Sequence, residues 1–230
     1  MRIMASKSTV STPHTLGYHI ANVISYVVNP LCLPPICAFL ITAHFCSDMQ
    51  QAWRVFGITA VFFGLLPLLY IVWMVKSGQT SSLEIREREA RKKPLLFGIT
   101  SSLIGCGLMM AFTQLHSAII LSICLIQIGN SVLMMIITFW WKISLHLTGL
   151  AGFVASLFFV EHNAWLLPIN DVIRTSWVLP LFFLIPVLAW ARVRVSAHTP
   201  AQVVGGSVVA FLLTYWIMWL INGQLYGIAV

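Results

Sequence analysis

The sequence predicts an all-α, polytopic integral membrane protein, and three observations lead to this fold class. Hydrophobic residues make up 59% of the chain and charged residues 8%, whereas an average soluble domain has about 25% charged residues. The mean hydropathy is +0.92. The apolar residues also form long runs without the two-residue alternation of a membrane barrel, so their backbone groups are satisfied as helices.

Seven apolar stretches are long enough to cross a membrane, which needs about 20 residues for each helix. They cover residues 20–44, 53–76, 95–115, 117–140, 147–161, 175–191 and 203–221. We therefore expect an N-terminal tail over residues 1–19 and one domain of about six to seven transmembrane helices over residues 20–230.

The first apolar stretch carries signals of a broken helix. It is longer than the roughly 7–15 residues of a signal-peptide core, so we interpret it as a retained membrane span. Asn29-Pro30 and Pro34-Pro35 lie within it. Because proline cannot donate a backbone hydrogen bond and clashes with the preceding turn, we expect a kink or a break at this position.

Tryptophans and charges fit the ends of the predicted helices. Tryptophan favours the membrane interface, and most of the nine tryptophans fall near the ends of the stretches. Seven crossings place all 13 lysines and arginines except Arg54 and Arg174 on one side. The positive-inside rule makes this side cytoplasmic. The sequence thus predicts a multi-pass protein of the plasma or inner membrane, and its net charge of +7 does not indicate a nucleic-acid partner.

Three short polar stretches interrupt the apolar chain, at residues 86–94, 144–146 and 192–202. Two crossings separate the first stretch from the second, and two separate the second from the third. An even number of crossings returns the chain to the same face of the membrane. We therefore expect the three stretches to lie at one face, where they can form a single site.

The first stretch is rich in cations. Arg86 and Lys93 are seven residues apart and would share one face of a helix, and Pro94 opens the third span. On the other faces, glutamates can offset the remaining cations at spacings of three and four residues. These are Glu84, Glu87 and Glu89 with Arg88, Arg91 and Lys92. The alternative is a cytoplasmic stop signal with solvated charges.

The second and third stretches carry two histidines. Ser144 and His146 stand at the start of the fifth span and would diverge on a helix, so an irregular turn is needed for both to face one ligand. Thr199 and Pro200 are typical of an N-cap and a first helical residue, which places His198 before a helix N-terminus that favours anions. Arg192 must reach His198 through the turn between two helices. The alternative is an interfacial histidine and a snorkelling arginine.

Taken together, the stretches resemble the tripartite signature of the phosphatidic acid phosphatase type 2 superfamily, over roughly residues 86–206. That signature is Lys-x6-Arg-Pro, Pro-Ser-Gly-His and Ser-Arg-x5-His-x3-Asp. This chain has Arg86-x6-Lys93-Pro94, Ile143-Ser144-Leu145-His146 and Ala191-Arg192-x5-His198-x3-Gln202. It departs from the signature in the exchanged cations, in Ile143 for proline, in Leu145 for glycine and in Gln202 for aspartate.

The resemblance implies a lipid phosphatase fold and a role for each matching residue. The phosphate of a phosphatidate-like or prenyl (di)phosphate lipid would be held by Arg86, Lys93, Ser144 and Arg192. His198 would attack phosphorus to form a phosphohistidine, oriented by Gln202, and His146 would act as general acid and base. Such a reaction requires no metal and no cofactor.

Two other functions remain open on the sequence alone. One is a noncatalytic binder or carrier of anionic phospholipid that uses the same phosphate cradle, because the Gln202 amide cannot offset an imidazolium charge. The other is the vanadate chemistry of the related haloperoxidases.

Within the fourth span, Gln127 and Asn130 are expected to tie helices together, since buried amides commonly do so in membranes. The alternative for this pair is binding of a lipid head group or chain.

Overall fold

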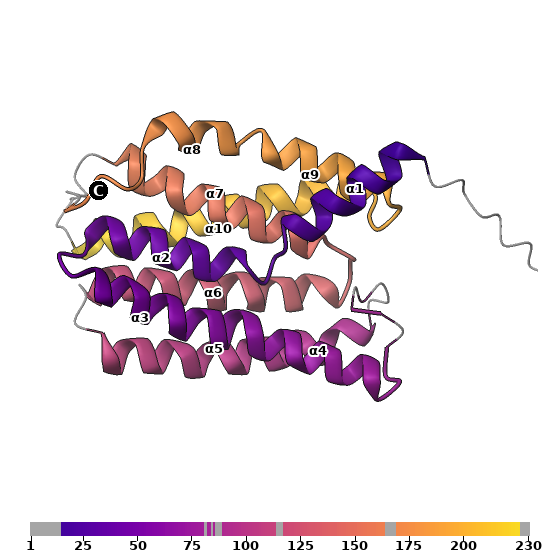
Figure 1. The fold of residues 1–230 in the computed structure, drawn as a ribbon, viewed down its shortest axis with the longest axis horizontal. Helices are drawn as coiled ribbons and strands as arrows, with labels where there is room; N and C mark the ends of the chain where they lie inside the picture. Colours follow the sequence, from indigo (N-terminus) through magenta and orange to yellow (C-terminus); the bar gives the residue numbers. More distant parts are fainter. Residues whose placement is uncertain are drawn as a thin grey trace, which may run out of the picture.

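The computed structural model describes residues 15–80, 82, 83, 85, 89–113, 117–163 and 169–225, and these residues contain helices and no strand. The helices lie roughly along one axis (Figure 1). In chain order they are α1 (Leu16–Val27), α2 (Leu33–Phe45), α3 (Met49–Thr59), the π-helical η1 (Ala60–Leu65), α4 (Leu66–Lys76), the 3₁₀ turn η2 (Glu89–Arg91), α5 (Lys92–Phe112), α6 (Ser117–Thr138), α7 (Leu145–His162), α8 (Thr175–Leu181), α9 (Leu184–Arg194) and α10 (Pro200–Leu225).

The predicted all-α polytopic bundle is confirmed. Among the described residues, six helical segments are long and apolar enough to cross a membrane. They are Met49–Lys76, Glu89–Phe112, Ala118–Thr138, Leu145–His162, Thr175–Arg194 and Pro200–Asn222. The first predicted span, residues 20–44, is represented by α1 and the shorter apolar helix α2. The protein is a multi-pass membrane protein by the length and composition of the other six segments.

The first predicted span is broken into two helices, α1 and α2, as its prolines predicted. Between them the Asn29 side chain accepts a hydrogen bond from the Leu31 backbone N–H at 2.9 Å, and prolines occupy the first positions of α2. Helix α1 begins at Leu16, inside the stretch assigned to the tail, and it extends from the bundle at an angle (Figure 1). It packs mainly against α9.

The second span, α3–η1–α4, is continuous but carries a π-helical turn. Pro67 follows this turn and has no N–H to donate to the preceding carbonyls. The missing hydrogen bond accounts for the wider π-helical turn at this position. Gly64 lies against the break between α1 and α2, since a Cβ there would be 2.9 Å from the Leu31 carbonyl oxygen. A glycine is required at this close approach.

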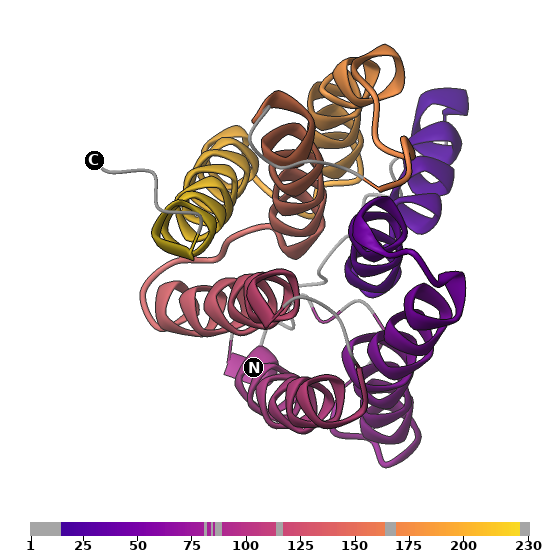
Figure 2. The ribbon, with the colours of Figure 1, turned by 90° about the vertical axis from the view of Figure 1, so that its left-hand side faces the viewer.

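Helix α7 lies at the centre of the bundle. In the most apolar part of α7, 61% of the residues are buried inside the protein, against 22–33% in the other five spanning segments. Helix α7 is therefore the segment most surrounded by protein. Seen along the bundle, it stands between α10, α2 and the α8–α9 pair (Figure 2). Residues at the start of α7 are therefore positioned by several helices.

The three polar stretches come to the same end of the bundle, as the crossing numbers predicted. Helices α5, α7 and α10 all begin at the end from which α1 projects (Figure 1). The described parts of the segments before them, 77–91, 139–144 and 195–199, therefore lie at one end of the molecule.

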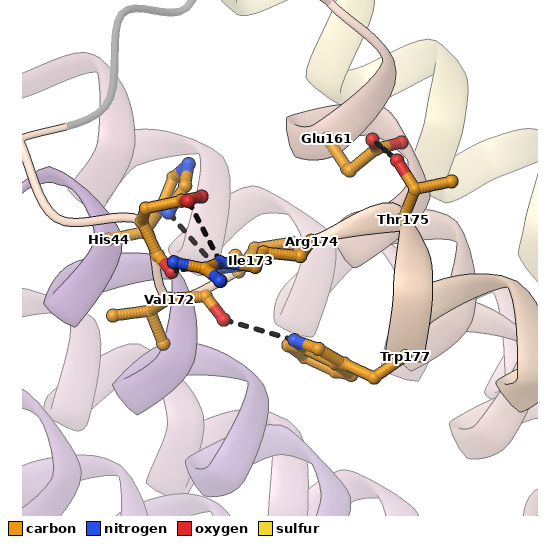
Figure 3. A network of polar contacts seen from close by, with 8 residues as sticks. His44, Glu161, Val172, Ile173, Arg174, Thr175 and Trp177 are labelled. Atoms are coloured by element: carbon orange, nitrogen blue, oxygen red, sulfur yellow. Dashed lines mark hydrogen bonds and ion pairs between the residues drawn. The ribbon is translucent and has the colours of Figure 1, made fainter.

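The opposite end is held by hydrogen bonds between the 169–175 segment and the helix ends (Figure 3). The His44 ring nitrogen Nδ1 accepts the Ile173 backbone N–H at 3.2 Å, and the Trp177 indole donates to the Val172 carbonyl at 3.1 Å. Arg174 forms an ion pair with Asp171 and also donates from Nε to the Asp171 carbonyl at 3.1 Å, and Thr175 is hydrogen-bonded to Glu161. His44 therefore has a structural role at this end.

Candidate functional site

A cavity of about 390 Å³ opens at the end of the bundle where the polar stretches meet. Its walls come from α1, α4, α5, α6, α7 and α9 and from the turn before α10. Four basic side chains line it, namely Arg91, His146, Arg192 and His198. Among the described residues that line it there is no aspartate or glutamate. This composition suits an anionic ligand.

Arg192 and His198 converge through the turn at the end of α9. The backbone N–H groups of Ala197 and His198 both donate to the Arg192 carbonyl, at 3.1 and 3.3 Å. Ser196 has φ of 55°, in the left-handed region that typically ends a helix with such bonds. Both side chains are buried and line the cavity. The turn thus brings Arg192 and His198 to the same cavity, as their six-residue spacing requires if both are to contact one ligand.

Gln202 holds His198 in one orientation. Its side-chain oxygen Oε1 accepts the Thr199 backbone N–H at 3.1 Å and lies 3.2 Å from His198 Nδ1. The Thr199 N–H needs an acceptor, so the oxygen of the Gln202 amide, and not its nitrogen, lies next to His198. His198 Nδ1 must therefore carry the ring proton and donate a hydrogen bond to Oε1. The other ring nitrogen, Nε2, is then left with a lone pair.

The same glutamine completes a capping box at the start of α10. The Thr199 hydroxyl accepts the Gln202 backbone N–H at 3.4 Å, while Gln202 bonds back to the Thr199 N–H. Pro200 is the first residue of α10, as predicted. The local signal Thr-Pro-x-Gln therefore places both the helix start and the partner of His198.

At the start of α7, the structure brings His146 to the cavity but gives Ser144 another position. Ser144 is fully buried and is the N-cap of α7, accepting the Leu147 N–H at 3.5 Å, and it is not part of the cavity lining. His146 lines the cavity and contacts the backbone of Ser25 on α1. The predicted phosphate contact of Ser144 stays a prediction.

The first stretch differs from the expected arrangement. Arg86 lies outside the described residues. Lys93 is exposed, with its Nζ 3.4 Å from Gln79 Oε1, and does not line the cavity, whereas Pro94 does. The expected pairing of Glu89 with Lys92 is present, at 2.6 Å.

Arg91 takes the inward position instead. It was expected on a different helix face from Arg86 and Lys93, with its charge offset by glutamate, but it is only 6% exposed. Its Nε donates to the Ile85 carbonyl at 2.8 Å and its Nη1 to the Ile143 carbonyl at 3.1 Å. Arg91 ends the 3₁₀ turn η2, which turns it away from the face of Lys93. The seven-residue spacing of Arg86 and Lys93 carried no signal for this position.

His198 lies among cations and is kept neutral. Burial, followed by the nearby charges of Arg91, Arg192 and Lys142, lowers the pKa of its imidazole to about 3, while the Gln202 hydrogen bond opposes the shift. A neutral imidazole beside two guanidinium groups can act as a nucleophile toward a bound phosphate, because the cations offset the phosphate charge.

Comparison with protein-family models, with curated proteins and with solved structures finds no match. The family resemblance of this chain therefore rests on the residues and spacings described above. The geometry of the cavity is the independent ground on which a function can be proposed.

The inward position of Arg91 gives a direct prediction. Arg91→Ala is expected to weaken binding of a lipid phosphate by about 10² to 10³-fold, because it removes a buried cation from the cavity wall. Lys93→Ala should change binding by less than about 2-fold, since an exposed charge is screened. Titration calorimetry of the purified variants with a lipid phosphonate measures both. Equal losses in the two variants would contradict the assignment.

The lowered pKa of His198 predicts a pH-dependent stability. Its pKa is about 3 in the folded protein, against an ordinary value of 6.5 in the unfolded chain, so between these values the unfolded chain binds a proton that the folded chain does not. The contribution is fully present above pH 6.5 and is lost as pH falls toward 3. The thermal midpoint in detergent should therefore fall more between about pH 7 and pH 4 in the wild type than in His198→Asn. Parallel curves for the two proteins would show that His198 is not the group responsible.

Proposed function

We propose that the protein is a membrane lipid phosphatase that hydrolyses a phosphatidate-like or prenyl (di)phosphate substrate through a phosphohistidine. The observation that supports this most is the meeting of His146, Arg192 and His198 in one cavity. His146 comes from the second polar stretch, and Arg192 and His198 come from the third. Arg192 follows His146 by 46 positions in the sequence. Arg91, from the first stretch, joins them.

In the proposed first step, the lone pair on His198 Nε2 attacks the phosphorus atom. The bond between phosphorus and the lipid oxygen breaks, and His146, which takes up a proton when the anionic phosphate binds, gives that proton to the leaving oxygen. Arg91 and Arg192 hold the nonbridging oxygens, where negative charge must be stabilised in the transition state. The products of this step are the lipid alcohol and a phosphorylated His198.

In the second step, water attacks the phosphohistidine. His146, now neutral, takes a proton from the water, the phosphorus–nitrogen bond breaks, and inorganic phosphate leaves. The electron pair returns to His198 Nε2, which restores the starting state. The Gln202 carbonyl oxygen keeps the proton on Nδ1 throughout and so keeps Nε2 available.

The positive-inside rule supports a cytoplasmic position for this end of the bundle. The described lysines and arginines of the first and third polar stretches lie here, whereas Arg174 lies at the other end. The substrate would therefore be a lipid of the cytoplasmic leaflet.

A noncatalytic binder or carrier of anionic phospholipid is the second candidate, and Gln202 is the observation that favours it. An amide oxygen fixes the His198 tautomer but carries no charge to offset an imidazolium. A protein that only binds phosphate would need the arginines and could do without the nucleophile.

Phosphate release by the purified protein separates these functions. The protein in detergent is incubated with phosphatidate, a single-chain lysophosphatidate, or a prenyl diphosphate, and inorganic phosphate is measured. Release that saturates with at least one lipid supports the phosphatase. Saturable binding that depends on Arg192, without release and without dependence on His198, would support the carrier. Halide oxidation that requires added vanadate would support the haloperoxidase chemistry.

A further inference from the structure

The break in the first span leaves a backbone carbonyl without its helical partner beside the basic cavity. Helix α1 ends at Val27, and the N–H of Val28 still bonds to the Ile24 carbonyl at 2.9 Å. The next carbonyl, that of Ser25, would accept the Asn29 N–H if the helix continued. Among the described residues, no backbone N–H bonds to it. Because a carbonyl inside a membrane protein needs a hydrogen-bond donor, this one requires a donor from outside α1.

Asn29 and Pro30 specify where the helix stops. The residue before a proline is disfavoured in the α conformation, because the proline ring clashes with it. Asn29 accordingly lies outside both helices, and its side chain accepts the Leu31 N–H as in a turn. All three residues line the basic cavity. Irregular backbone at the depth of a membrane is tolerated where it lines such a cavity.

His146 supplies the missing donor. Its ring is hydrogen-bonded to the backbone of Ser25, and both residues line the cavity. The Ser25 N–H lies within α1 and bonds to the carbonyl one turn earlier, while the Ser25 hydroxyl donates to the Ala21 carbonyl at 2.9 Å. The group that faces His146 is therefore the Ser25 carbonyl. Since a carbonyl can only accept, the bonded ring nitrogen of His146 carries a proton.

Glycines allow the break to pack closely against its neighbours. A Cβ added at Gly149 would be 3.3 Å from Pro30 Cβ and 3.4 Å from Pro30 Cα. Gly149 follows His146 by three residues, so the two are neighbours on one face of α7. From η1, Gly64 approaches the Leu31 carbonyl, to which an added Cβ would be 2.9 Å. This packing of the break on α7 sets the end of α1 beside His146.

We infer that the proline break in the first span positions His146 for acid–base chemistry, with the Ser25 carbonyl holding one ring nitrogen so that the other faces the cavity. This inference rests on the proposed function for the use of the second nitrogen. That nitrogen gives its proton to the leaving lipid oxygen and later takes one from water, while the proton held by Ser25 stays in place. Pro30 and Gly149 act through His146 and are positioning residues.

Nitrogen NMR tests the hydrogen bond without any substrate. Histidine labelled at its ring nitrogens is incorporated into the purified full chain in detergent, and His146 is identified by the signals that His146→Asn removes. In the wild type, we expect the neutral His146 ring to occupy one tautomer, with one protonated and one bare nitrogen. A wild-type ring that populates both tautomers would overturn the inference, even if no further variant folds.

Pro30→Ala should release His146 from this single tautomer. Without the proline ring, Asn29 can enter the helix and donate its N–H to the Ser25 carbonyl. The His146 ring then loses its acceptor, so its two nitrogens should show signals averaged between the tautomers. A folded Pro30→Ala protein that keeps the wild-type tautomer would contradict the role of the break.

Gly149→Ala and Gly152→Ala form a matched pair on α7. The first adds a methyl group against Pro30, and the second adds one against the Thr214 hydroxyl of α10, in each case 3.3 Å from the nearest atom. Gly152 is not part of the lining of the basic cavity. We expect mixed tautomers of His146 in Gly149→Ala alone. Mixing to the same extent in both variants would overturn the inference, since crowding of α7 and not the break would then control the ring.

Turnover tests the use of the second nitrogen. Pro30→Ala and Gly149→Ala should each lower kcat for a lipid phosphate by about 10 to 10²-fold, with KM within about 2-fold, because the proton donor is misplaced. The first-turnover release of para-nitrophenol from para-nitrophenyl phosphate should change by less than about 2-fold, since this leaving group needs no acid. Gly152→Ala should keep kcat within about 2-fold for both substrates. Equal losses with the two substrates in Pro30→Ala and Gly149→Ala would overturn the positioning role.

The two kinds of measurement separate this inference from the phosphatase itself. A single wild-type tautomer that Pro30→Ala mixes, without phosphate release from any substrate, would support the hydrogen bond and refute the phosphatase. Phosphate release together with a His146 tautomer that neither Pro30→Ala nor Gly149→Ala changes would support the phosphatase and refute positioning by the break.

Discussion

His198→Ala is expected to lower the rate of phosphate release by about 10⁴-fold or more, because the attacking atom is lost and no other described imidazole shares its position. Lipid phosphonate should still bind, since Arg91 and Arg192 remain in the cavity wall. Phosphate release under saturating substrate measures the first effect and calorimetry the second. In addition, an alkaline denaturing quench of the wild type with labelled substrate should trap phosphate on His198 in a bond that is stable to base and labile to acid.

His162→Ala provides the matched control for this experiment. His162 is the last residue of α7 and stacks on Phe158, with ring centroids 5.2 Å apart, at the far end from the basic cavity. Its loss removes an imidazole from the same membrane protein without touching the cavity. Turnover in His162→Ala should stay within about 2-fold of wild type. Unchanged turnover in His198→Ala would refute the phosphohistidine mechanism.

Arg192→Ala is expected to lower kcat/KM by about 10² to 10³-fold. Arg192 is only 3% exposed and lines the cavity beside His198. Its guanidinium would hold the phosphate oxygens more firmly as charge develops, so kcat should fall as well as affinity. Arg192→Lys should recover part of the loss, because an ammonium keeps the charge but lacks the planar fork. Steady-state kinetics of the three proteins gives the comparison.

Arg194→Ala distinguishes a loss at the cavity from a general loss of positive charge. Arg194 is two residues further along α9 and is exposed, and its Nη2 donates to the Thr15 hydroxyl at 2.8 Å. A surface contact of this kind contributes little to stability. We expect wild-type kinetics from this variant. If Arg194→Ala and Arg192→Ala lose activity equally, the cavity assignment of Arg192 fails.

Much of the architecture could be predicted because membrane helices obey simple rules. Long apolar runs predicted the helices, and the prolines at 30, 34 and 35 predicted the break between α1 and α2. An even number of crossings predicted that the polar stretches share one end of the bundle. Thr199 and Pro200 predicted the start of α10 as its N-cap and first helical residue.

The inward-facing residues were harder to predict because rotation about a helix axis depends on how a helix starts. Arg91, Lys92 and Lys93 are adjacent cations, and the 3₁₀ turn before α5 decides that Arg91 is the buried one. Ser144 and His146 are two residues apart, and the capping role of Ser144 leaves only His146 in the cavity wall. No spacing in the sequence specifies either choice.

The side-chain oxygen Oδ1 of Asn130, which is buried and has no hydrogen-bond partner among the described residues, could not be predicted from sequence either. A polar residue within a membrane span indicates a tie between helices, and the bond to Thr214 confirms that interpretation. Whether one of its atoms remains unpaired depends on which groups the neighbouring helices present. That is a property of the assembled bundle.

The turn at Ser196 has a consequence for how this protein can change. Because the His198 N–H is bonded to the Arg192 carbonyl, the distance between the two functional side chains is set by a closed ring of backbone atoms. Side chains along the ring can be exchanged, and glycine at 196 would fit the positive φ with less strain. Insertion or deletion of one residue would open the ring and separate the two groups. In this segment the protein can therefore tolerate changes in residue type but not in length.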